Sequence, residues 1–204
     1  MTSTATERRA DSAAAAGVHA LIADRWSPRA FDPAHELGGD EVLALLEAAR
    51  WAPSAANSQP WRFVVAHRGE HAHDVLADAL AGPNQAWAPQ ASALILIATE
   101  TSDDDGRPRP YAHYDAGQAA ALLVLQAQAL GLATHQMGGF DKGAARDGLD
   151  LPDRVDPLVV VAVGRHEPEA VLPDPFAARE VAPRARLPIA DLLLTPPARI
   201  RTAA

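Results

Sequence analysis

Three side chains near the amino-terminal end are of the types that bind a phosphate group. Arg25, Ser27 and Arg29 alternate along a segment that is interrupted by Pro28 and Pro33. A guanidinium presents a planar fork of donors that matches phosphate oxygens, and a serine hydroxyl adds one more donor. The same pattern also occurs at an ordinary helix C-terminus, where cations are favourable and stay solvated. The residues alone leave both interpretations open.

A second polar group lies in the segment from Pro53 to Gln59. Ser54, Asn57 and Gln59 carry donors and acceptors that can meet the amide-like edge of a flat ring. The Pro60-Trp61 pair that follows fixes the turn and adds a large apolar group. The alternative is a helix C-terminal turn in which Asn57 adopts a left-handed backbone and Trp61 lies in the core.

Two further pairs of residues complete the set of candidates. Gly138 and Gly139 follow an expected strand, and glycines there let the backbone approach a flat ligand closely. They could equally form a tight turn. Arg184 and Arg186 stand in a proline-rich segment, where they would either add cations to a phosphate site or remain solvated.

Several classes of function are excluded or disfavoured. The chain has no cysteine, which rules out thiol catalysis, disulfides and cysteine-ligated metals. Its net charge of −8 argues against nucleic acid as the main partner. His71 and His73 are two apart, so they do not share a helix face, and no metal site is expected. The sequence has no P-loop motif, no Gly-x-Ser-x-Gly motif of a hydrolase and no Gly-x-Gly-x-x-Gly motif after a strand, as dinucleotide binding would need. His113, Tyr114 and Asp115 are interpreted as a helix N-terminal turn in preference to an acid–base group.

The candidates must be positioned by alternating helices and strands. Val42, Leu45, Leu46 and Ala49 recur at helical spacing, between an Asp40 N-cap and a stop before proline 53. Further helices are expected over residues 11–25, 72–80 and 111–130, the last capped by glycine 131. Strands are expected over residues 63–66, 92–99, 135–139 and 158–164, of which 92–99 is apolar throughout and suits a sheet covered on both faces.

The 204 residues, 48% of them hydrophobic, predict one globular α+β or α/β domain over residues 11–194. Residues 1–10 are expected to be frayed, and 195–204 to form a tail. Seven of the 17 prolines fall between Pro168 and Pro197, so this arm has no core of its own and must lie on another surface. Without an apolar signal sequence or an unbroken membrane-length helix, a soluble cytoplasmic protein is expected.

From about residue 18 to 194, the chain resembles the FMN-dependent nitroreductase family. Four blocks in order carry the resemblance: RWSPRAF at 25–31; ARWAPSAANSQPWRF at 49–63; DAG at 115–117 with ALGL at 129–132 and GGFD at 138–141; and VG at 163–164 with RARLP at 184–188. The resemblance implies an α+β fold, a three-layer α/β/α sandwich with a mixed, mainly antiparallel sheet. It also implies a homodimer with FMN at the subunit interface and an arm that embraces the partner.

The resemblance also assigns roles to residues. Arg25, Ser27 and Arg186 are expected at the phosphate, Asn84 near the reactive edge of the ring, and the Gly138-Gly139 backbone along its face. The loop that holds Ser54 would reach the flavin of the opposite subunit. The full expected set is Arg25, Trp26, Ser27, Arg29, Pro53, Ser54, Asn57, Gln59, Asn84, Gly138, Gly139, Arg184 and Arg186.

The implied activity is hydride transfer from NADH or NADPH through the flavin to a nitroaromatic, quinone or flavin-like acceptor. Flavin N5 would be the reactive atom, so no catalytic side chain is expected. The alternatives are flavin-dependent oxidation of a specific substrate on the same fold and a non-catalytic flavin-binding dimer. Trp26, Trp87 and Gly138 depart from the family pattern, Gly138 because many members carry a glutamate there.

Overall fold

The computed structural model describes residues 17–194. The described chain divides into two compact units, Arg25–Val181 and a smaller one that combines residues 17–24 with 182–194. That residues 11–194 act as a single domain stays a prediction.

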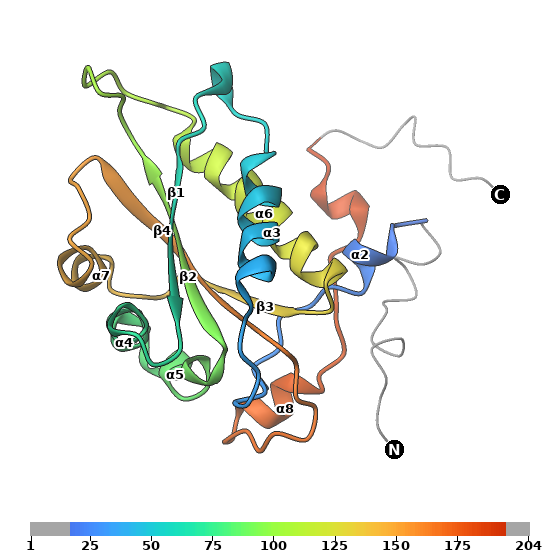
Figure 1. Ribbon diagram of the computed structural model, residues 1–204. Coiled ribbons are helices and arrows are strands. Elements are labelled where there is room, and N and C mark those ends of the chain that lie inside the picture. Colours follow the sequence, from blue (N-terminus) through green and yellow to red (C-terminus); the bar gives the residue numbers. More distant parts are fainter. Residues whose placement is uncertain (1–16, 195–204) are drawn as a thin grey trace. The chain divides into compact units, whose positions relative to one another are not determined.

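The larger unit is built on a four-stranded sheet (Figure 1). Its strands are β1 (Trp61–His67), β2 (Ala93–Glu100), β3 (Ala133–Met137) and β4 (Val155–Gly164), arranged in the order β1-β2-β4-β3. Each neighbouring pair is antiparallel, so the expected α+β fold with a mainly antiparallel sheet is confirmed. No parallel pairing occurs among the strands of residues 17–194.

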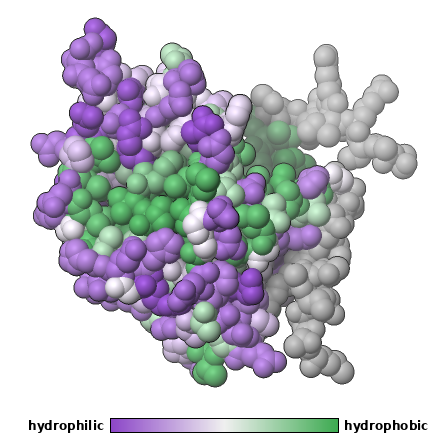
Figure 2. All heavy atoms as spheres, in the orientation of Figure 1, coloured by the Kyte–Doolittle hydropathy of each residue, from purple (hydrophilic) through white to green (hydrophobic). Residues whose placement is uncertain are grey.

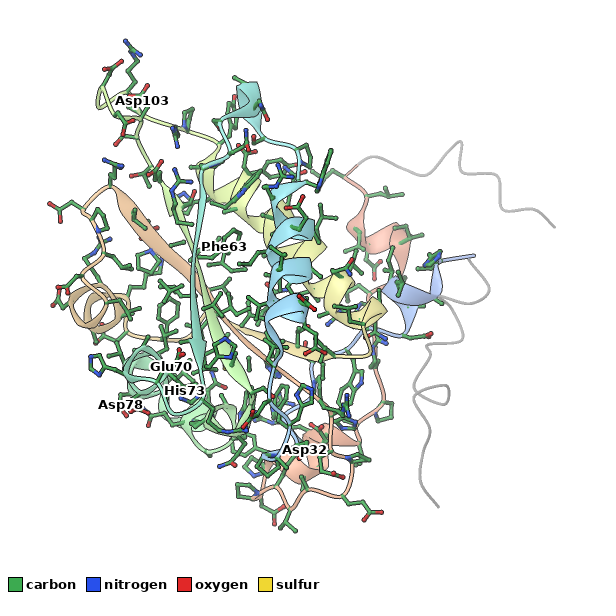
Figure 3. All side chains as sticks on the ribbon, viewed as in Figure 1. Asp32, Phe63, Glu70, His73, Asp78 and Asp103 are labelled. Carbon is green, nitrogen blue, oxygen red and sulfur yellow. The ribbon has the colours of Figure 1, made fainter. Side chains whose placement is uncertain are left out.

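Helices cover both faces of this sheet. One layer holds α3 (Gly39–Arg50) and α6 (Ala112–Ala129), and the other holds α4 (His71–Ala79) and α7 (Lys142–Gly148). Side chains of a strand alternate between faces, so Ile95 and Ile97 join the cluster with α3 and α6, while Leu94 and Leu96 join that with α4 and α7. Phe63 points from β1 toward the α3 and α6 layer (Figure 3).

Full burial of both faces explains the unbroken apolar run of β2. Each Leu or Ile side chain removed from water in this way contributes about 1.5–3 kcal/mol. The remaining short elements lie on the connections: α2 (Ala20–Ala23), η2 (Ala55–Asn57), α5 (Gly82–Gln85), η3 (Ala88–Gln90), α8 (Phe176–Glu180) and η4 (Ile189–Leu192). No helix within residues 17–194 has the length and apolar character needed to cross a bilayer.

Three expected boundaries are wrong. The described part of the helix expected over 11–25 is helical only at Ala20–Ala23, because Gly17 has a φ of 69° and the His19 side chain caps the helix start. Residues 11–16 lie outside the described chain. Helix α3 has Gly38, not Asp40, at its N-cap. Strand β3 covers Ala133–Met137, so the two glycines lie beyond its end.

The other expected helices and strands agree with the structure to within a few residues. Helix α4 corresponds to the helix expected over 72–80, and α6 to the one expected over 111–130. The ends of both helices differ from the expected ones by one residue. Gly131 follows α6 with a φ of 74°, as expected of a glycine after a helix C-terminus. Strand β1 is longer than the expected 63–66 because Trp61 pairs with Thr99 and His67 with Ala93.

Hydrophobic side chains form a band on the face that carries β1 and α3 (Figure 2). Leu43 on α3 and Trp51 at its end are 65% and 74% exposed. A contiguous apolar patch of this kind is typical of a surface that contacts another molecule.

Candidate functional site

The segment from Arg25 to Phe31 is held in place by contacts to its backbone. The N–H groups of Arg29 and Ala30 donate to the two carboxylate oxygens of Glu180, at 2.9 and 3.3 Å. The carbonyl of Pro28 lies 2.9 Å from Nδ1 of His135 on β3. These anchors leave the Arg25 Nη1 3.3 Å from the Ser27 hydroxyl, so two phosphate-type donors sit together.

Glu180 is a charged anchor inside the protein. Only 7% of the residue is exposed, and His166 Nε2 lies 3.3 Å from its Oε1. Burial raises the pKa of Glu180, but the contact with His166 and the Arg29 and Ala30 amides outweigh it and leave the pKa below its usual range. The carboxylate is therefore ionised at neutral pH. Trp26 packs edge-on against His166, with ring centres 5.2 Å apart, which places it beside this anchor.

Arg29 faces a different environment from Arg25. Its guanidinium lies 5.9 Å from the ring centre of Trp87, and its side chain lines a cleft of about 480 Å³ together with Phe31 and Trp87. Burial is the main cause that lowers the pKa of Arg29. Trp87 is 1% exposed and packs against Phe31 and His135, so it acts as a core side chain.

Asn84 and the two glycines come together at the end of β3. The Ala81 N–H donates to the Gly139 carbonyl at 2.9 Å, and the Asn84 N–H donates to the Ala81 carbonyl at 2.8 Å. Both glycines are exposed, and a Cβ built at Gly138 would meet no atom within 4 Å. The backbone here is open to a flat ligand. His135 on β3 contacts both the carbonyl of Pro28 and the ring of Trp87, which follows α5 in the chain. The Arg25–Phe31 segment, α5 and the end of β3 therefore form one group.

The loop from Pro53 to Gln59 has an unusual backbone. Ala56, Asn57 and Gln59 have φ values of 51°, 55° and 44°, in the left-handed region that disfavours residues with a Cβ. The loop is stabilised by the Gln59 N–H, which donates to the Ser54 hydroxyl at 3.0 Å, and by the Ala55 N–H, which donates to Asp115 at 3.0 Å. Such strain, of order 1–3 kcal/mol per residue, persists where the surroundings enforce it and is frequent at ligand sites.

The same loop forms one wall of an open pocket of about 400 Å³. Pro53 and Ser54 face the start of α6 across it, where Tyr111 and Tyr114 are 61% and 70% exposed. Sequence reasoning missed these two tyrosines as lining residues. Their spacing of three on a helix places them on one face and is the signal that could have found them.

The interpretation of residues 113–115 as a helix N-terminal turn is confirmed, since α6 begins at Ala112. His113 Nε2 lies 2.7 Å from Asp156, while the buried Asp115 accepts the Ala55 N–H, so the two side chains have separate partners. Burial raises the pKa of Asp156, but His113 and Lys142 outweigh it and lower the pKa. In the described part of the chain, no cluster of three or more His, Asp or Glu side chains could hold a metal ion.

Within the larger unit the candidates form two groups. Figure 1 places η2, in the Ser54–Gln59 loop, at one end of β1 and α5, which contains Asn84, at the opposite end. Arg184 and Arg186 belong to the smaller unit. There Arg184 Nη1 donates to the Ala23 carbonyl at 2.5 Å, and Arg186 is exposed. Their place beside Arg25 and Ser27 stays a prediction.

Comparison with known proteins identifies the family. The profile of the Nitroreductase family matches residues 22–90 and 71–165. An uncharacterized 15.4 kDa protein of Mycolicibacterium smegmatis is 37% identical over 143 residues, covering 66% of this chain and 95% of that protein. The putative NAD(P)H nitroreductase YdgI of Bacillus subtilis is 29% identical over 183 residues, covering 71% and 86%.

A solved structure described as an oxidoreductase containing FMN has a TM-score of 0.83 and 36% identity, and covers 100% of both chains. The family profile spans more than half of the chain, and the relatives align over most of their own length. The fold, with its antiparallel sheet between two helical layers, agrees with these matches. The chain therefore belongs to the nitroreductase family.

Proposed function

We propose that the protein is an FMN-dependent oxidoreductase that takes hydride from NADH or NADPH and reduces a nitroaromatic, quinone or flavin-like acceptor. The observation that carries this proposal is the Arg25–Phe31 segment, fixed by Glu180 and by His135, which lies on the strand that leads into the open Gly138-Gly139 backbone. A structural neighbour described as containing FMN and a relative named as an NAD(P)H nitroreductase support it.

The residues present fit the phosphate and ring of FMN. The Arg25 guanidinium and Ser27 hydroxyl, 3.3 Å apart, would donate to the phosphate, and Arg186 would add a second cation. The glycine backbone would lie along the ring, with Asn84 near its reactive edge. When bound, FMN supplies the redox chemistry by accepting hydride at N5 and passing electrons to the acceptor. The protein would bind and orient the flavin and shield it from water, and no side chain would act as a nucleophile.

We further propose that a second copy of the chain completes the site. The loop that carries Ser54, Asn57 and Gln59 lies at the end of β1 remote from Asn84, so one chain does not present both groups to one ring. In a homodimer the loop of one subunit would reach the flavin of the other. The exposed Leu43 and Trp51 supply apolar surface for such contact, and the proline-rich arm would lie on the partner.

The first experiment is an absorption spectrum of the purified protein, followed by anaerobic addition of NADPH and, separately, NADH. A flavin band that bleaches is expected, and the faster donor identifies the preferred nicotinamide. A band that persists with both donors would refute the reductase and favour oxidation of a specific substrate or a non-catalytic role. A protein that takes up no FMN would refute the phosphate site.

Matched variants sharpen this test. Arg25→Gln should weaken FMN binding at least tenfold, because it removes a charged donor to the phosphate. Arg154→Gln is the control, since this arginine is 47% exposed, pairs with Glu100 and Asp104, and lines no pocket with the residues assigned to FMN. Light scattering in solution tests the homodimer, and cell fractionation tests the cytoplasmic location expected from the sequence.

A further inference from the structure

We propose a second ligand site, for a small carboxylate with an apolar body, at the end of the sheet where Glu100 lies. A cavity of about 290 Å³ opens there between β1, β2 and the segment that leads into β4. Arg62 and Arg154 stand at this cavity, and its apolar lining includes Val64, Ala98 and Leu151. None of the residues that we assign to FMN lines it.

Three guanidiniums surround one carboxylate at this cavity. Arg62 Nη2 and Arg109 Nη1 lie 2.7 and 2.9 Å from Glu100 Oε2, and Arg154 Nε lies 3.2 Å from Oε1. The Glu100 side chain is only 8% exposed, whereas those of Arg62 and Arg154 are each 47% exposed. The anion is therefore enclosed, and two of its cations reach the solvent side of the cavity.

Positive charge is in excess at the cavity mouth. Glu100 balances one of the three guanidiniums, and Asp104, 92% exposed and 3.4 Å from Arg154, partly balances another. Arg109 does not line the cavity and also interacts with Asp103, so the excess lies at Arg62 and Arg154. A fourth arginine, Arg146, donates to the carbonyls of Pro152 and Val155 at 2.8 Å each, which adds a cation behind the lining backbone. In a chain with a net charge of −8, this cluster of arginines favours an anionic ligand over a cationic one.

The apolar lining defines the class of anion. Val64 and Ala98 lie on neighbouring strands, with Arg62 paired opposite Ala98, so the charged and apolar surfaces are adjacent. A carboxylate on the arginines would place a ring or short alkyl body against Val64, Ala98 and Leu151. Inorganic phosphate would match the cations but leave the apolar surface wet. The cavity volume suits one small ring.

Benzoate is the probe, with benzamide as its neutral counterpart of the same shape. Calorimetric titration gives the affinity of the protein with FMN added to saturation, and backbone-amide NMR locates the site. Benzoate should shift the amides of Ala98, Leu151 and Val155, and benzamide should bind at least tenfold more weakly. Arg154→Gln should weaken the binding of benzoate at least tenfold, equivalent to about 1.4 kcal/mol. Arg107→Gln, outside this cavity, should leave the affinity unchanged.

A second variant tests the apolar half without altering charge. Leu151→Trp fills the cavity and should abolish binding while all four arginines remain; its fold is checked by circular dichroism. Arg62 is not used, because its Nη1 also donates to the carbonyl of Gln59 in the candidate flavin loop. The proposal is overturned if benzoate shifts only resonances of the 53–59 loop, if Leu151→Trp binds normally, or if inorganic phosphate binds as tightly as benzoate. These readouts do not depend on nicotinamide oxidation.

Discussion

Replacement of Glu180 should loosen the segment that we assign to the phosphate of FMN. The carboxylate accepts the backbone N–H groups of Arg29 and Ala30, of which Ala30 is only 2% exposed. Hydrogen bonds to a charged group contribute about 1.5–3 kcal/mol each, and a buried donor without an acceptor costs a similar amount. Glu180→Ala removes both acceptors, so the free energy of unfolding should fall by roughly 3–5 kcal/mol.

Glu180→Gln is the graded variant. It keeps one carbonyl oxygen as an acceptor but loses the charge, so a loss of about 1–2 kcal/mol is expected. Urea denaturation at pH 7 measures both variants, and an FMN titration should show at least tenfold weaker binding for Glu180→Ala. Glu36→Ala serves as the control, since Glu36 is exposed.

The pH dependence gives an independent check. The pKa of Glu180 is below its usual range in the folded protein, so its contribution is complete above the unfolded value of about 4.3 and disappears as pH falls through the folded value. The stability difference between the native protein and Glu180→Gln should shrink as the pH falls below about 4. If Glu180→Ala and Glu36→Ala lie within about 0.5 kcal/mol of each other, the anchoring argument is wrong.

Three further predictions follow from backbone geometry and burial. Ala56→Gly should raise the free energy of unfolding by about 1 kcal/mol in urea, because Ala56 has a φ of 51°; a loss of stability would contradict this. Gly148→Ala should lower the free energy of unfolding by about 1–3 kcal/mol, because a Cβ there lies 2.5 Å from Val75 Cγ1. Gly117→Ala on α6, where a Cβ meets open space, should raise it by about 0.5–1 kcal/mol. Equal shifts of the melting temperature in the two variants would refute this contrast. Burial lowers the pKa of His135, so the unfolded chain binds more protons and the free energy of unfolding should fall below about pH 6.5. In His135→Gln, the free energy of unfolding should change less between about pH 7.5 and 5.5. An unchanged pH dependence in this variant would contradict the prediction.

The elements that the sequence predicts well are those whose signal is local. The apolar run of β2 and the long helix α6 with Gly131 after it are specified by residues within each element. Helix α7 was not predicted, because seven residues with two glycines have little intrinsic helix propensity. It forms because Asp141 caps it through the Ala144 N–H at 3.0 Å and because Ala145 is buried.

Other features depend on partners far away in the chain. Strand β3 begins two residues earlier than expected because Ala133 pairs with Gly164 on β4. The N-cap of α3 falls at Gly38 because the Glu41 side chain accepts its N–H at 2.8 Å. Glu180 had no local signal at all, since it acts on backbone groups 150 and 151 positions away. The side-chain types in the sequence are enough to predict the candidate residues. That Glu180 holds their segment in place becomes visible only in the folded structure.

The position of β2 in the sheet has a consequence for synthesis on the ribosome. The strand can pair with β1 as soon as it emerges, but its other partner, β4, follows more than 50 residues later. At roughly 5–20 residues per second, one edge of an apolar eight-residue strand stays open for about 3–10 s. During that interval the nascent chain offers a template for pairing with other chains. A holding chaperone that covers this stretch should therefore raise the yield of folded protein more than one that acts after release.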